Sequence, residues 1–306
     1  MNNKIFINYL NKNNDYLLYK KTLNEFGNSK LVNSLFNKKH TNPNRKTNYS
    51  IFYTELDEIN KNFIKFDKIG IKYWADICFA PGEQVKYIKK RIKEAQGIGI
   101  SLQIKDGGYK VVEGVIDERF KGYFYNLLTD FKKIIHIFNN YPNEFNYVFI
   151  GCFARHNKIT RNNTQDPYLE LLKIDIQLQL RALYIALLKL KKIRKSSIMI
   201  LYSIKNLTSL ANLFYILKLY FKTVVFYKSE TYFNYRGVVY IKATDYQYEN
   251  LNLSYLHSLI CKDLHKDIIF DINFMNVFYK KIKKILKIHQ SAMNDILNGK
   301  ITKLLY

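Results

Sequence analysis

The sequence predicts an α/β protein with a doubly wound, mostly parallel sheet and helical extensions at both ends of the chain. Strand-like apolar runs alternate with helix-like periodic stretches from residue 51 to residue 245, which is the pattern of such a sheet. One run, residues 73–79, breaks into an Ala-Pro-Gly turn and then into a helix-like stretch. A strand, a turn of small residues and a helix N-terminus commonly bind a nucleoside or phosphate. With 306 residues, 48% of them hydrophobic, the chain can bury a full core.

The elements of the central part follow from the period of their apolar residues. Short apolar runs indicate strands, and apolar residues at steps of three and four indicate helices. Strands are expected at residues 73–79, 98–102, 110–115, 147–151 and 197–202. Helices are expected at residues 51–66, 84–95, 120–139, 169–190 and 207–220. The last two runs, 223–227 and 237–243, predict an antiparallel hairpin at the sheet edge.

Three segments are expected along the chain. Residues 1–48 form a basic N-terminal extension with a Pro- and Asn-rich linker, residues 49–248 the α/β domain, and residues 249–306 a C-terminal helical extension. From Phe274 to Met293, apolar residues repeat at helical spacing among lysines. That pattern is typical of a solvated face over a packed stripe. A surface for a phosphate backbone or a protein partner is the alternative.

The charge of the chain indicates a polyanionic partner. Lys and Arg total 49 against 25 acidic residues, a formal charge of +24, and RNA is the expected partner. The alternative is codon usage in an AT-rich genome, such as that of a virus or plasmid-like element, which inflates Lys, Asn, Ile and Tyr.

The cysteines and the apolar runs predict a compartment. Cys78, Cys152 and Cys261 lie far apart without CxxC spacing, which predicts neither a zinc site nor a disulfide and fits a reducing compartment. No run of about 18 apolar residues occurs, so no membrane span is expected. The first residues lack the apolar core of a signal peptide. A cytoplasmic protein is expected.

Two groups of basic residues are the candidate RNA contacts. Arg155, Lys158 and Arg161 lie in a polar loop after the expected fourth strand, at the sheet edge where ligands bind. Lys228 and Arg236 flank a stretch whose aromatic residues could stack on bases. The alternative is that these aromatic residues belong to the core.

The order of segments resembles the FtsJ-type family of ribose 2′-O-methyltransferases. Residues 52–59 resemble the family's leading helix. Residues 76–82 (Asp-Ile-Cys-Phe-Ala-Pro-Gly) resemble its Asp-Leu-Gly/Cys-x-Ala-Pro-Gly-Gly cofactor loop. Further resemblances are the second strand, the Leu-rich helix with its following strand, and the closing hairpin, at residues 97–102, 169–204 and 221–241. The resemblance covers residues 51–245 and implies a Rossmann-like methyltransferase fold.

The resemblance also implies an S-adenosylmethionine site at the cofactor loop. The residues that match it are Asp76, Ala80, Pro81, Gly82, Ser101 and Asp117. Glu83 departs from the family's second glycine, and Ser101 from the acidic residue that binds the cofactor ribose. S-adenosylmethionine is therefore a candidate cofactor whose binding these departures put in doubt, and no metal is expected. Asp76 has an equal structural interpretation, in which it organises the amides of the turn.

Catalysis in this family runs through a Lys-Asp-Lys-Glu tetrad, whose second lysine promotes deprotonation of the 2′-hydroxyl. Our alignment finds none of the four at its position. The residues there are Thr54 or Glu55, Cys152, Tyr202, and Gly237 or Val238. If the protein is active, the candidate replacements are Lys65 and Lys205.

The resulting hypothesis is a catalytically degenerate family member. It would act as an RNA-binding or stimulatory subunit of an RNA-processing assembly for mRNA capping or polyadenylation. The first alternative is an active RNA ribose 2′-O-methyltransferase with relocated groups. The second is a structural interaction protein.

Overall fold

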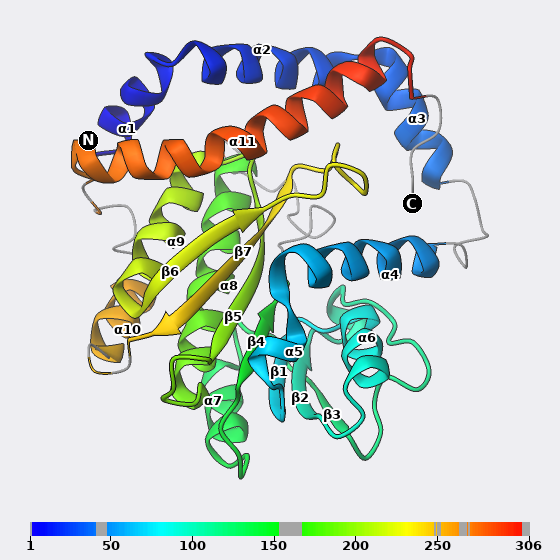
Figure 1. Cartoon of the computed structure of the whole chain (residues 1–306), viewed down its shortest axis with the longest axis vertical. Coiled ribbons are helices and arrows are strands. Elements are labelled where there is room, and N and C mark those ends of the chain that lie inside the picture. Colours follow the sequence, from blue (N-terminus) through cyan, green and yellow to red (C-terminus); the bar gives the residue numbers. More distant parts are fainter. Residues whose placement is uncertain are drawn as a thin grey trace.

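A single twisted sheet forms the centre of the protein (Figure 1). The computed structural model describes residues 2–40, 48–152, 167–247, 249, 252–262, 268 and 270–301. In these residues seven strands pair in the order β3-β2-β1-β4-β5-β7-β6. Their bounds are β1 Tyr73–Ile77, β2 Gln96–Ser101, β3 Phe120–Phe124, β4 Tyr147–Ile150, β5 Ser197–Ser203, β6 Phe221–Tyr227 and β7 Val238–Tyr246.

The strand directions confirm the predicted fold class. The strands β1 to β5 pair in parallel, while β7 pairs antiparallel with both β5 and β6. The expected hairpin is therefore present, with β7 inserted between β5 and the edge strand β6. Buried apolar runs at both faces explain why these strands lack the alternation of a half-exposed sheet.

Helices cover both faces of the sheet. On one face, α4 (Asn48–Ile59), a π-helical turn, α5 (Phe66–Ile69) and α6 (Glu83–Arg91) enclose a core around Trp74, Tyr147 and Tyr240. On the other face, a second core contains Ile77, Val148 and Ile200. The helices that pack there are α7 Phe131–Asn139, α8 Pro167–Lys189, α9 Leu207–Tyr220 and α10 Leu253–Lys262.

The helices from both ends of the chain lie together in one layer (Figure 1). The long helix α11 (Ile272–Leu297) packs along α2 (Asn14–Asn28), which is flanked by α1 (Asn2–Asn11) and α3 (Lys30–His40). Lys283 forms an ion pair of 2.5 Å with Asp15. The division into three segments at residues 48 and 249 stays a prediction.

The third strand lies further along the chain than expected. It spans residues 120–124, not 110–115, and α7 begins only at Phe131, so the expected helix at 120–139 was wrong in its first half. The reason is packing between strands. Phe120 pairs with Gly97 and stacks on Trp74 at 5.0 Å, and the bare glycine leaves room for both rings. Residues 110–115 instead lie over the loop after β1, where the Val112 amide donates to the Pro81 carbonyl at 3.0 Å.

No helix in the described ranges is both long enough and apolar enough to span a bilayer.

Candidate functional site

The loop after β1 and the end of β2 meet at the carboxyl edge of the sheet. The amides of Cys78 and Phe79 donate to the Ile100 carbonyl at 2.7 and 3.2 Å, and the Ala80 amide donates to the Ser101 hydroxyl at 3.3 Å. The Ala80–Pro81 bond is cis. Gly82 has φ +113°, and a Cβ there would lie 2.4 Å from a methyl group of Val115, so only glycine fits. The structure thus brings five of the six expected cofactor residues to this edge.

Asp76 lies beneath this loop inside β1. Both of its carboxylate oxygens are buried and have no hydrogen-bond partner in the part of the chain that the structure describes. Asp76 therefore does not organise the turn amides there. Burial and the nearby Glu83 carboxylate raise the pKa of Asp76 well above its usual value of 3.8, which favours the protonated form of the group.

Glu83 begins α6 at the position of the family's second glycine. Burial raises the pKa of its carboxyl, while the amides of Gly82 and Glu83 itself act in the opposite direction. Free amides at a helix N-terminus attract anions. The Glu83 carboxylate therefore occupies the place at which those amides would bind an anionic ligand.

Asp117 lies away from this loop, at the opposite edge of the sheet. It precedes β3 and accepts hydrogen bonds from the amides of Arg119 and Phe120 at 3.0 and 3.1 Å. It also forms an ion pair with the buried ammonium of Lys89. These contacts hold the turn into β3. Because β3 follows Asp117 instead of preceding it, Asp117 is not brought to the cofactor edge.

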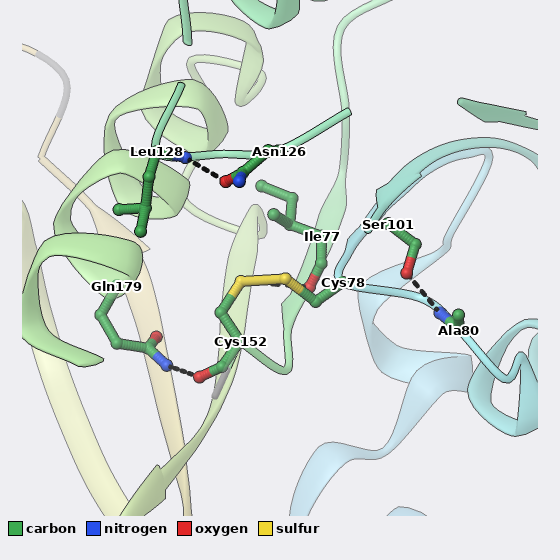
Figure 2. Close-up of a disulfide and its surroundings, with 8 residues drawn as sticks. All are labelled: Ile77, Cys78, Ala80, Ser101, Asn126, Leu128, Cys152 and Gln179. Atoms are coloured by element: carbon green, nitrogen blue, oxygen red, sulfur yellow. Dashed lines mark hydrogen bonds between the residues drawn. A yellow bond between two sulfur atoms is a disulfide. The ribbon is translucent and has the colours of Figure 1, made fainter. Parts of the chain in front are cut away.

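Cys78 and Cys152 form a disulfide, which corrects the expectation drawn from their spacing (Figure 2). They lie directly after β1 and β4, which are neighbours in the sheet, and their Cα atoms are 5.3 Å apart. Cys78 has φ +74° where the family's loop has Gly or Cys. The helix α8 joins this link, because Gln179 Nε2 donates to the Cys152 carbonyl at 2.6 Å. The bond joins the ends of the two strands between which the strand order reverses, which is where open α/β sheets bind ligands.

One position of the tetrad, Glu55, belongs to a different polar cluster, which the sequence reasoning missed. Glu55 on α4 is buried, and its burial raises the pKa of its carboxyl to about 7, although the cations of Arg236 and Lys228 oppose the shift. Burial lowers the pKa of Lys228 to about 7. Its ammonium donates to the carbonyls of Arg236 and Val238 at 2.6 and 3.0 Å. Tyr240 on β7 completes the cluster through its hydrogen bond to Glu55.

The two replacement lysines lie at opposite ends of β5. Lys65 is exposed. Burial lowers the pKa of Lys242, and the nearby charge of Lys65 adds to this; Lys242 pairs with Met199 near the start of β5. Lys205 is exposed just beyond the end of β5, and its side chain lies against Gly237. The structure does not bring Lys65 and Lys205 together.

The candidate RNA contacts fall into two groups. Arg155, Lys158 and Arg161 lie outside the described residues. Lys228 is buried, as described, and the Arg236 guanidinium lies 3.9 Å from the ring centre of Phe233. Their role in RNA binding stays a prediction.

The sheet order, with β7 antiparallel, and the loop after β1 define a Rossmann-like methyltransferase fold. No protein-family model matches the sequence. No curated protein matches it.

Three solved structures illustrate the similarity in arrangement. A protein described as a ribosomal RNA methyltransferase from Plasmodium falciparum has 16% sequence identity and a TM-score of 0.44 over 63% of this chain and 96% of its own. A structure of a fibrillarin/Nop5p complex has 10% sequence identity and a TM-score of 0.40, over 57% of this chain and 72% of the matched chain. Human methyltransferase-like protein 13 in complex with SAH has 9% sequence identity and a TM-score of 0.40, over 70% of this chain and 96% of its own. These values are too low to assign an activity or a substrate to this chain.

The donor set of the loop fits S-adenosylmethionine poorly. The Ser101 hydroxyl accepts a hydrogen bond from the Ala80 amide. Ser101 also has no carboxylate with which to bind the hydroxyl groups of a ribose. The Glu83 carboxylate lies at the N-terminal amides of α6. A cofactor with its own carboxylate would meet like charge there, which disfavours binding.

Proposed function

We propose that the protein is an RNA-binding subunit with a methyltransferase fold that does not transfer a methyl group. We place it in an RNA-processing assembly for mRNA capping or polyadenylation. The observation that carries the proposal is Glu55, a buried acid at the position where the resemblance places the first catalytic lysine. The cations of Lys228 and Arg236 act on its carboxyl, so the cluster is built as a structural unit.

The loss of methyl transfer is supported by the geometry of the remaining candidates. A lysine that deprotonates a hydroxyl needs a lowered pKa and a position within hydrogen-bond reach of the substrate. Lys65 and Lys205 are exposed and lie at opposite ends of β5. Cys152, at the position of the aspartate, is engaged in the disulfide.

RNA binding is supported by the formal charge of +24, since Lys and Arg total 49 against 25 acidic residues. A protein that neutralises several phosphates releases their counterions, so its affinity falls steeply with salt. A structural interaction protein lacks this dependence. The cytoplasmic location stays a prediction.

Two measurements on the purified chain test the proposal. Calorimetric titration with S-adenosylmethionine should give no binding at millimolar ligand, and capped RNA should receive no labelled methyl group. Fluorescence anisotropy with a single-stranded RNA should show micromolar or tighter affinity with a steep salt slope. Methyl transfer would overturn the loss of activity, and affinity that does not change with salt would overturn the role in RNA binding.

The variant Glu83→Gly is a matched control for the cofactor loop. Gly82 precedes it with a left-handed backbone, and a glycine restores the small turn of the family. If cofactor affinity appears in this variant alone, the Glu83 carboxylate is the group that excludes the cofactor.

A further inference from the structure

A cavity of about 720 Å³ lies between α4, the end of β6 and α11. We name it the α4–α11 cavity. Among its lining residues are Asp57, Glu58 and Lys61 from the leading helix and its π-helical turn, Tyr227 and Tyr232 after β6, and Lys284 from α11. Figure 1 shows α4 and α11 on either side of the connection that follows β6. The volume is that of a small-molecule site, and it lies at the carboxyl edge, far along the sheet from the loop after β1.

Each acid of the cavity has a hydrogen-bond or ion-pair partner. Glu58 accepts hydrogen bonds from the Tyr227 hydroxyl at 2.5 Å and the Ser229 hydroxyl at 2.9 Å. Asp57 accepts one from the Tyr87 hydroxyl and forms an ion pair with Arg91. Glu230, a further lining residue, pairs with Lys284 at 3.3 Å.

Lys61 is a lining residue whose ammonium has no acidic partner in the described part of the chain. Lys61 is exposed and makes no ion pair or hydrogen bond within the residues that the structure describes. Lys228 also lines the cavity, and its ammonium is held by two main-chain carbonyls. The lining carries three lysines and three carboxylates, and Lys61 is the lysine whose ammonium is open to a phosphate.

The rest of the lining offers aromatic and apolar surface. Tyr227 and Tyr232 contribute rings, and Ile285 and Ile288 of α11 contribute aliphatic wall. Phe63 stacks on the Tyr227 ring at 5.0 Å and holds it in place. Rings fixed beside a free cation match a nucleotide, because bases stack on aromatic side chains while the phosphate seeks a lysine.

We infer that the α4–α11 cavity holds one unstacked nucleotide of a single-stranded RNA. The base lies against Tyr232 and Tyr227, and the adjoining phosphate lies at Lys61. This inference rests on the proposed function and adds the location of the RNA contact. It also gives α11 a role, since α11 supplies one wall of the site.

Anisotropy with a uridine-rich single strand tests the inference on the full chain. Lys61→Ala should weaken binding about three- to tenfold and reduce the salt slope by about one. Tyr232→Ala should weaken it about tenfold. The matched controls are Lys132→Ala on α7 and Tyr255→Ala on α10, both exposed on the other face, and they should change affinity less than twofold. Thermal melting confirms that each variant folds.

Photo-crosslinking with 4-thiouridine supplies a second readout that needs no variant. Adducts on Tyr227 or Tyr232 support the inference. If the wild type binds RNA but Lys61→Ala and Tyr232→Ala bind equally well and the adducts lie elsewhere, the inference is overturned while the proposed function stands. If the wild type binds no RNA, both are overturned. Displacement of the RNA by uridine monophosphate at equal concentration would overturn RNA as the occupant in favour of a free nucleotide.

Discussion

Cys78 and Cys152 are joined between the ends of the neighbouring strands β1 and β4, although their positions in the sequence differ by 74. The bond fixes the loop after β1 to the end of β4. Closing a loop of this length restricts the unfolded chain, which stabilises a protein by about 2–4 kcal/mol.

A reductant should therefore lower the melting temperature of the wild type and leave that of Cys152→Ala unchanged. Alanine fits the buried Cys152 site without adding a polar group. Alkylation followed by mass spectrometry counts the free thiols. Without reduction only Cys261, which is exposed, should react. Reaction of all three cysteines before reduction would show that the bond is absent.

Asp76→Asn should stabilise the protein more at pH 8 than at pH 5. Burial raises the pKa of Asp76 in the folded state above 3.8, so the native state binds the proton more tightly than the unfolded state. The free energy of unfolding then falls as pH rises above about 4, and asparagine removes that loss. Urea denaturation at both pH values measures it. Parallel pH profiles of the two proteins would show that Asp76 ionises normally.

His289→Gln should flatten the loss of stability in acid. The ring is buried, with Nδ1 3.0 Å from the Tyr19 hydroxyl and Nε2 2.9 Å from the Tyr235 carbonyl. Burial lowers the pKa of His289 to about 3, and the cations of Lys228 and Lys205 add to this. The contribution of the neutral ring is therefore present above about 6.5 and is lost as pH falls toward 3. Urea midpoints between pH 7 and pH 4.5 should drop less in the variant than in the wild type.

Glu55→Gln and Lys228→Met should each destabilise the protein by about 0.5–3 kcal/mol, since each removes a charge that partly offsets the burial of the other group. The double variant should lose less than the sum of the two. Lys205→Met, which removes an exposed lysine nearby, is the control and should change the free energy of unfolding little. Additive losses in the double variant would show that Glu55 and Lys228 do not interact.

The central elements follow from local patterns in the sequence. The strands at residues 73, 147 and 197 are short, mostly apolar runs, and α9 spans the predicted residues 207–220. The third strand could not be located this way. Phe120–Phe124 merges with the apolar residues that follow, and its pairing depends on glycines in β2, a feature of the sheet and not of the segment.

The candidate site was predictable in part for the same reason. The loop with Ala80 and Gly82, and its neighbour Ser101, follow from a strand that ends in small residues. The disulfide and the Glu55–Lys228 cluster join residues that only the fold brings together. A lysine such as Lys228 carries no sign in the sequence that it is buried, because its partner lies on the leading helix.

The packing of α2 on α11 has a consequence for synthesis on the ribosome. Tyr19 and His289 are 270 residues apart, so at roughly 5–20 residues per second the partner of α2 arrives tens of seconds after α2 leaves the exit tunnel. During that time the strands of the sheet can pair, while the inner side of α2 has nothing to pack against. Chaperone capture of the nascent chain is expected to centre on α2 and to end when α11 emerges.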